Sequence, residues 1–147
     1  KNDAAALYNA LKDKRVIKHM ASEGFTLESC QSIVEKSSEH WKKYNIGDYA
    51  VVCKETETII GWAGFKFWQE KEFEILLVLS PKYWGLGHNI YLELINMAKN
   101  DFKLKKVYVL LPETRKSFRL IQKLGFEFCK KEEFHDEAFN KFVRNLE

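Results

Sequence analysis

The chain has 147 residues, of which 46% are hydrophobic and 14% aromatic, and its formal net charge is +3. This length and composition argue against a disordered chain and predict one domain, residues 1–147, with a substantial core. The small positive charge permits nucleic-acid binding but gives no reason to expect it, because nucleic-acid domains concentrate basic residues on one face.

The sequence lacks the usual signals of a membrane protein, a secreted protein or a metalloprotein. No apolar run approaches the roughly 18 residues of a membrane span, and we expect no signal peptide. The three cysteines are scattered and form no Cys-x-x-Cys, which favours reduced thiols in a cytoplasmic protein. The four histidines have no ligand spacing, so we expect no metal.

The first half of the chain predicts helices followed by a meander of strands. Asp3 reads as a helix cap ahead of residues 4–12, with residues 13–20 as an extension. Because the chain starts directly on this cap, we expect a further segment, a strand, upstream of residue 1. Thr26 is expected to cap a helix that runs to about Tyr44. Three strands with tight turns between them follow: residues 49–54, 59–68 and 73–79.

The second half alternates helices and strands. We expect a helix from about 88 to 102 that buries Ile90, Leu94, Met97 or Ala98, and Phe102. A strand over 106–111 and a helix over 114–124 follow, and Gly125 stops that helix. The last two predicted strands are residues 126–134 and 139–146.

The most informative segment is Trp-Gly-Leu-Gly-His-Asn at residues 84–89, between the buried strand and the helix. Glycines let backbone N–H groups approach a ligand closely, and a helix N-terminus favours negative charge, so the segment predicts a diphosphate site. A dinucleotide-binding motif needs a third glycine where Ile90 stands, and a Walker loop needs Gly-Lys-Ser/Thr, which is absent. The short turns before the segment also indicate a sheet that is at least partly antiparallel.

The motifs and the order of the elements together resemble the GNAT N-acetyltransferase superfamily, closest to its RimJ/RimL ribosomal-protein acetyltransferase branch. The resemblance covers the whole chain loosely and residues 49–128 well. The matching motifs are Glu74-Ile75, Pro81-Lys-Tyr-Trp-Gly-Leu-Gly87, Ser117 and Lys123-Leu-Gly-Phe126.

The resemblance implies an α+β fold: a central, mostly antiparallel twisted sheet with helices on both faces. The sheet is expected to splay between the strands at 74–79 and 106–111. It also implies that acetyl-CoA is the co-substrate. The residues implied to bind it are Leu77, Val78, Leu79, Trp84, Gly85, Leu86, Gly87, His88, Asn89, Ile90, Thr114, Ser117 and Lys123.

The sequence departs from the family pattern at four positions. Asn89 replaces a small residue, and Thr114 stands where Asn is common. Ile121 stands where many relatives carry a Tyr general acid, and Val109 where some carry a carboxylate base.

Acetyl transfer to an amine needs a base, because alkylammonium groups have a pKa of about 10 and must lose a proton first. Glu74 matches the acidic position of the branch and is the expected base. The alternative interpretation is a solvated glutamate at a strand end, and Glu72 and Glu113 are weaker candidates for the same role.

The remaining implied contacts are of two kinds. Backbone groups of residues 77–79 would pair with pantetheine and supply an N–H for the oxyanion, although these residues also read simply as core. A basic group on the later helix is either a solvated face or a shelf for the 3′-phosphate of coenzyme A. Its members are Arg115, Lys116, Arg119 and Lys123.

The sequence therefore predicts a cytoplasmic N-acetyltransferase, monomeric or homodimeric, that moves an acetyl group from acetyl-CoA to a primary amine by direct attack. The acceptor is a protein N-terminus or a small-molecule amine. The alternative is a catalytically silent acyl-CoA-binding or regulatory module. No nucleic acid, membrane or metal is expected as a partner.

Overall fold

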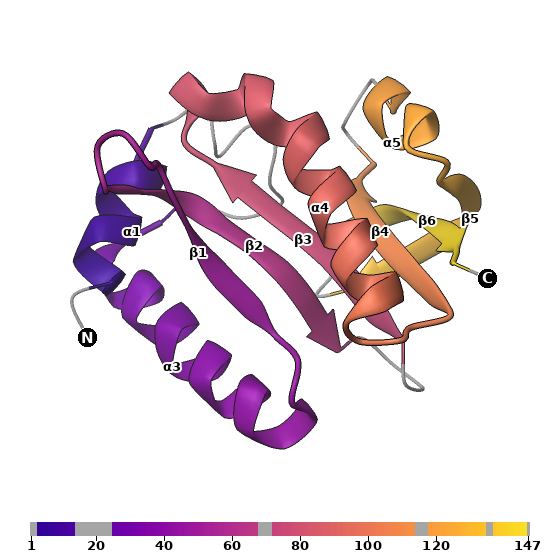
Figure 1. The fold of residues 1–147 in the computed structure, drawn as a ribbon, viewed down its shortest axis with the longest axis horizontal. Coiled ribbons are helices and arrows are strands. Elements are labelled where there is room, and N and C mark those ends of the chain that lie inside the picture. Colours follow the sequence, from indigo (N-terminus) through magenta and orange to yellow (C-terminus); the bar gives the residue numbers. More distant parts are fainter. Residues whose placement is uncertain (1–2, 14–24, 68–71, 114–117, 135–136, 147) are drawn as a thin grey trace. The chain divides into compact units, whose positions relative to one another are not determined.

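The computed structural model describes residues 3–13, 25–67, 72–113, 118–134 and 137–146 (Figure 1). Its helices are α1 (Asp3–Leu11), α3 (Leu27–Tyr44), the 3₁₀ helix η1 (Pro81–Leu86), α4 (Gly87–Asn100) and α5 (Arg119–Lys123). Its strands are β1 (Asp48–Val52), β2 (Ile59–Phe67), β3 (Phe73–Leu79), β4 (Lys106–Pro112), β5 (Glu127–Phe134) and β6 (Glu137–Asn145).

The chain forms two compact units, and β3 contributes to both. The first unit comprises Lys1–Lys66 with Leu76–Gly87, and the second comprises Phe67–Ile75 with His88–Glu147. Each unit is described by itself below. The prediction of a single acetyltransferase domain with a strand upstream stays a prediction.

The strands follow the order β1-β2-β3-β4-β6-β5. β1 pairs with β2, β4 with β6 and β5 with β6 in antiparallel fashion, whereas β3 and β4 are parallel. Within the second unit, Glu74 of β3 is in register with Tyr108 of β4. The mixed, mostly antiparallel sheet with helices confirms the predicted fold class.

Helix α3 is defined by its two caps. The Thr26 hydroxyl accepts a hydrogen bond from the Ser29 N–H at 3.0 Å, and the Ser29 hydroxyl accepts one from the Thr26 N–H at 2.9 Å. This capping box satisfies two donors that a helix start leaves open. At the other end, Asn45 adopts a left-handed conformation with φ of 55°, and its N–H donates to the Trp41 carbonyl. The predicted helix from Thr26 to about Tyr44 is confirmed.

The first unit packs α1 and α3 around Trp62 of β2. Its core consists of Ala4, Leu7, Leu11, Cys30, Trp62 and Val78. Strands β2 and β3 approach each other closely at Gly61, where a Cβ would lie 2.1 Å from the Val78 carbonyl oxygen. Only glycine fits at that position.

The second unit buries the apolar face of α4 and one face of its strands. The buried helix positions are Tyr91, Leu94, Ile95 and Ala98, and Val107, Val109 and Phe142 are the most deeply buried strand residues. The predicted burial of Leu94 and Ala98 is confirmed. Ile90, Met97 and Phe102 are only half-buried, because the apolar stripe of the helix centres on Tyr91 and Ile95.

One local prediction is corrected: Phe118 has φ of −116° and lies outside α5, which is shorter than the helix predicted over 114–124. The segment before α4 is a 3₁₀ helix over 81–86, and Pro81 at its first position favours helical φ values. Leu27, in the first turn of α3, is 44% exposed. No helix in the described part of the chain is long and apolar enough to cross a membrane.

Candidate active site

The backbone of β3 presents different groups to its two edges. Ser80 N–H donates to the Ile60 carbonyl at 2.7 Å, and the Val78 carbonyl oxygen lies beside Gly61, so residues 78 and 80 face β2. Because backbone groups alternate along a strand, those of Leu77 and Leu79 face the opposite edge. Three residues were expected to pair with pantetheine. The backbone groups of Leu77 and Leu79 point away from β2, which is the suitable orientation, whereas those of Val78 face β2.

Trp84 anchors the glycine segment to the end of β3. Its indole Nε1–H donates to the Leu79 carbonyl at 2.9 Å, although the side chain is 40% exposed. This bond occupies one lone pair of Leu79 and leaves its N–H unaffected. The expectation that Trp84 packs against the segment agrees with this contact.

The glycines take up the helical conformation as the chain enters α4. Gly87 has φ of −54° and its N–H donates to the Trp84 carbonyl, so this donor is used inside the chain. Gly85 is exposed with open space around its Cα, and Leu86 is 44% exposed. In the second unit, α4 continues through half-buried His88 and Ile90 and exposed Asn89. Helix α4 has 14 residues and directly follows η1, and the diphosphate site predicted at its start stays a prediction.

Glu74 lies where β3 meets β4, with Tyr108 as its register partner. Its side chain is half-buried and takes part in interactions within the fold. Residues directly opposite in a sheet project to the same face. Glu74, Tyr108 and Glu72, which is two residues away, therefore share one face of the second unit.

Glu72 belongs to a buried ionic cluster. Its Oε1 lies 2.8 Å from the Lys141 Nζ, and Lys141 is only 4% exposed. Lys141 also lies 4.2 Å above the Tyr108 ring and 4.0 Å from Glu132 Oε1. A buried ammonium needs such partners, because removing a charge from water is costly.

The cluster changes the proton affinities of its members. Burial favours the neutral carboxyl of Glu72, but hydrogen bonds from Lys141 and Tyr108 and the nearby positive charges outweigh burial and lower its pKa. Burial, reinforced by the Glu72 carboxylate, raises the pKa of Tyr108 to about 12. A carboxylate with a lowered pKa and two bound donors is a poor proton acceptor, which disfavours Glu72 as the base.

Glu113, Val109 and Ile121 offer less to acid–base chemistry than Glu74 does. Glu113 is exposed, and its carboxylate lies 3.6 Å from Lys131 Nζ. Val109 and Ile121, at the positions where relatives carry a carboxylate and a tyrosine, are each 1% exposed within the apolar core. The role of Glu74 as the base stays a prediction.

The basic group of the later helix is only partly described. Thr114, Arg115, Lys116 and Ser117 lie outside the described residues, and Arg119 and Lys123 are exposed on α5. Exposure agrees with either interpretation, a solvated face or a phosphate shelf.

Sequence reasoning missed two features. One is the Glu72–Lys141–Tyr108 cluster, whose members are up to 69 positions apart in the sequence. The sequence signal that could have indicated it is a lysine between Phe139 and Val143 in an apolar strand pattern.

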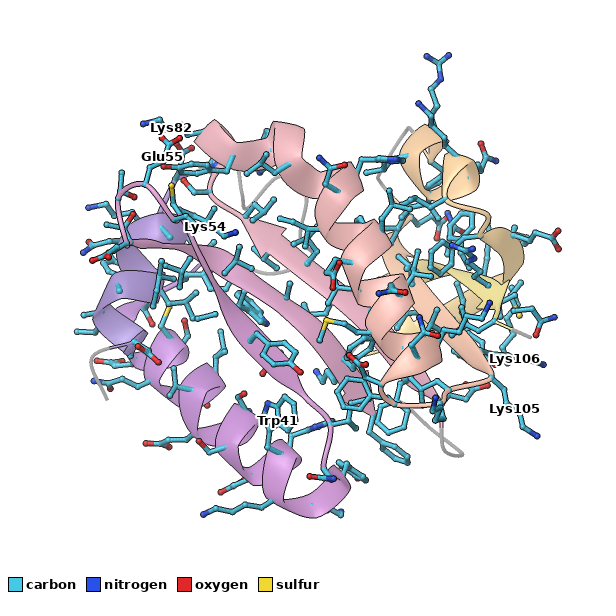
Figure 2. All side chains as sticks on the ribbon, viewed as in Figure 1. Trp41, Lys54, Glu55, Lys82, Lys105 and Lys106 are labelled. Carbon is cyan, nitrogen blue, oxygen red and sulfur yellow. The ribbon has the colours of Figure 1, made fainter. Side chains whose placement is uncertain are left out.

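The other is the contact of the β1–β2 turn with η1 (Figure 2). There, hydrogen bonds from Thr56, then from the Glu55 backbone and from Tyr83, lower the pKa of the Cys53 thiol.

No group of three or more His, Cys, Asp or Glu side chains suited to a metal ion occurs among the described residues.

The sequence profile of the acetyltransferase (GNAT) domain matches residues 1–127. The chain belongs to the GNAT acetyltransferase family. The match includes β3, the glycine segment and α4.

Solved structures share this fold at low sequence identity. Spermidine N-acetyltransferase from Vibrio cholerae, in complex with CoA and spermine, is 15% identical, with a TM-score of 0.77, covering 99% of this chain and 91% of its own. Ribosomal-protein-S5-alanine acetyltransferase from Vibrio fischeri is 16% identical, with a TM-score of 0.76 and coverages of 98% and 88%. A GNAT-family acetyltransferase from Bacillus anthracis is 19% identical, with a TM-score of 0.74 and coverages of 97% and 87%.

Proposed function

We propose that this GNAT-family protein is an acetyl-CoA-dependent N-acetyltransferase acting on a primary amine. The observation that carries the proposal is the orientation of the Leu77 and Leu79 backbone groups away from β2, in the part of β3 that directly precedes the glycine segment in the chain. An extended pantetheine arm can hydrogen-bond to such an edge as an added strand does. The diphosphate then binds at the glycine segment and the N-terminus of α4, which follow β3 in the chain.

The reaction follows from what Glu74 can do. Its carboxylate accepts a proton from the acceptor ammonium, directly or through a water molecule. The neutral amine nitrogen forms a bond to the thioester carbonyl carbon. The carbon–sulfur bond then breaks, and the proton that the nitrogen loses passes to the leaving thiolate, directly or through water, so that CoA leaves as its thiol. A backbone N–H at the β3 edge stabilises the oxygen that gains negative charge.

The acceptor class is proposed from the relatives. One structural neighbour is named for spermidine and another for the alanine of a ribosomal protein. Both acceptors present a primary amine, which agrees with a protein N-terminus or a small-molecule amine here. Membership of the RimJ/RimL branch, a cytoplasmic location and a monomeric or homodimeric state belong to the same proposal.

A second candidate function is a silent acyl-CoA-binding module. It is favoured by Val109 and Ile121, which put apolar, buried side chains where relatives carry acid–base groups. A thiol-release assay with a panel of peptides and small amines separates the two functions. An enzyme releases CoA with at least one amine, whereas a silent module binds acetyl-CoA and releases none.

The co-substrate site is tested by Gly87→Glu. This substitution places a side chain and a negative charge at the buried first residue of α4, so it should abolish the rise in melting temperature that acetyl-CoA produces. The matched control is Asn100→Glu, which adds the same charge at the exposed far end of α4. Unchanged acetyl-CoA affinity of Gly87→Glu in calorimetry would exclude the glycine segment as the diphosphate site.

A further inference from the structure

The second unit contains a buried lysine that the proposed acetyl transfer does not use. Lys141 of β6 is 4% exposed, and its register partner on β4 is Leu110. Its ammonium group lies 4.2 Å from the centre of the Tyr108 ring on β4 and 2.8 Å from Glu72 Oε1, directly before β3. Since β4 lies between β3 and β6 in the sheet, the Lys141 side chain reaches across β4 and joins β6 to the start of β3.

Further contacts fix both members of this ion pair. The Tyr108 hydroxyl donates a hydrogen bond to the Glu72 carboxylate. On the other side, Glu132 Oε1 lies 4.0 Å from the Lys141 Nζ and 3.1 Å from the Lys130 Nζ. Rotation of either the Glu72 or the Lys141 side chain would therefore break more than one contact.

Stability alone gives little reason for a charged pair at this place. The attraction between two buried charges roughly offsets the cost of removing them from water, and apolar replacements are often neutral or stabilising. The neighbours of Lys141 on the same face of β6 are Phe139 and Val143, so an apolar side chain would suit the strand. Unlike an apolar contact, a charged hydrogen bond fixes the position of one group relative to another.

The segment that the ion pair fixes is the start of β3. Glu72 comes two residues before Glu74, and alternate residues of an extended segment point to the same side. Glu74 is also in register with Tyr108, which contacts both members of the ion pair. A catalytic base must be held within about 0.5 Å of its productive position.

We propose that the ion pair of Lys141 with Glu72 positions the Glu74 carboxylate for proton transfer. Glu74 is the base only in the proposed function, on which this role of the ion pair therefore rests. Lys141 and Glu72 are positioning residues that act through Glu74. Their loss slows proton transfer from the acceptor ammonium and leaves the binding of acetyl-CoA unchanged.

The test variant combines Glu72→Met with Lys141→Met, which removes both charges at similar side-chain volume. In the thiol-release assay it should lower turnover at neutral pH by roughly tenfold to 10²-fold, the loss expected from a small misplacement of a reacting group. Its acetyl-CoA affinity in calorimetry should equal that of the wild type. The matched control, Lys131→Met with Glu133→Met, makes the same changes at exposed positions of the neighbouring strand β5 and should keep wild-type turnover.

Two comparisons separate positioning from a general loss of structure. In a Glu74→Gln background, the two methionine substitutions should cause no further loss of turnover, because the group that they position is already gone. The defect should also shrink at high pH, where the free amine becomes abundant without a base. A merely structural role would lower turnover equally in both backgrounds and at every pH.

Wild-type turnover in the double methionine variant would overturn the positioning role and leave the proposed acetyl transfer intact. An equal further loss in the Glu74→Gln background would overturn it as well. Absence of CoA release by the wild type with every amine would instead overturn the proposed function, and the positioning role with it. Circular dichroism checks folding; if the double variant does not fold, Glu72→Gln decides by the same two comparisons, since it keeps the side-chain volume and removes the charge.

Discussion

Replacing Tyr108 by phenylalanine removes one hydroxyl from the buried cluster on the charged face of the second unit. Tyr108 is 8% exposed, its hydroxyl bonds to Glu72 and its ring lies under the Lys141 ammonium. Burial and the Glu72 carboxylate raise its pKa from 10.0 to about 12. The folded protein therefore holds this proton more tightly than the unfolded chain does.

The direction and size of the change in the free energy of unfolding with pH follow from the coupling between protonation and folding. A raised folded-state pKa contributes stability that is fully present below the unfolded value of about 10 and is lost as pH rises through the folded value. The full contribution is about 3 kcal/mol, and about 1 kcal/mol of it is lost by about pH 11. Phenylalanine has no proton to lose, so the Tyr108→Phe variant lacks this part of the alkaline destabilisation.

The assay is urea unfolding of wild type and Tyr108→Phe between about pH 9 and 11. The free energy of unfolding of the wild type relative to the variant should fall by about 1 kcal/mol over this range. In Glu72→Gln, the absorbance titration of tyrosinate should show a lower pKa for Tyr108, because its charged acceptor is gone. A wild-type-minus-variant difference that is independent of pH would refute the reasoning.

Three further outcomes are expected. Glu74→Gln should lower turnover at neutral pH by roughly 10²–10⁴-fold with near-normal acetyl-CoA affinity, and the defect should shrink at high pH; near wild-type turnover from about pH 6 to 9 would falsify the role of Glu74. Arg115→Ala combined with Lys116→Ala should weaken the binding of CoA more than the binding of 3′-dephospho-CoA, since only CoA carries the extra phosphate. Equal losses of affinity for the two ligands in calorimetry would contradict the phosphate shelf and favour the interpretation as a solvated face. The lowered pKa of Glu72 gives stability that is present above its unfolded value and lost as pH falls through the folded value. The melting temperature of Glu72→Gln should therefore fall less than that of the wild type as the pH is lowered. Equal falls in the two proteins would contradict the ion pair with Lys141.

Features set by neighbouring residues could be predicted from the sequence. The Thr26 cap predicted the start of α3, because its partner Ser29 is only three positions away. Gly125 was expected to stop α5, and it has φ of 88°, a conformation that favours glycine. The strand over 73–79 was predicted with its observed bounds, since its alternation and the following proline are both local.

Features set by pairing between distant segments could not be predicted. Which backbone groups of β3 face away from β2 depends on the register with Gly61 and Ile60, and a shift of one residue would exchange Leu77 for Val78. The burial of Lys141 depends on Glu72 and Tyr108, which come from distant parts of the sequence. The ion pair that disfavours Glu72 as the base could therefore be found only in the structure.

The most direct test of the central claim identifies the reaction product. The purified protein is incubated with isotopically labelled acetyl-CoA and the amine that responds best in the thiol-release panel, and the products are followed by mass spectrometry. We predict one labelled acetyl group on the amine nitrogen for each CoA released, and loss of this product in Gly87→Glu. Acetyl-CoA that binds but stays intact with every amine would contradict the enzyme and leave the silent acyl-CoA-binding module.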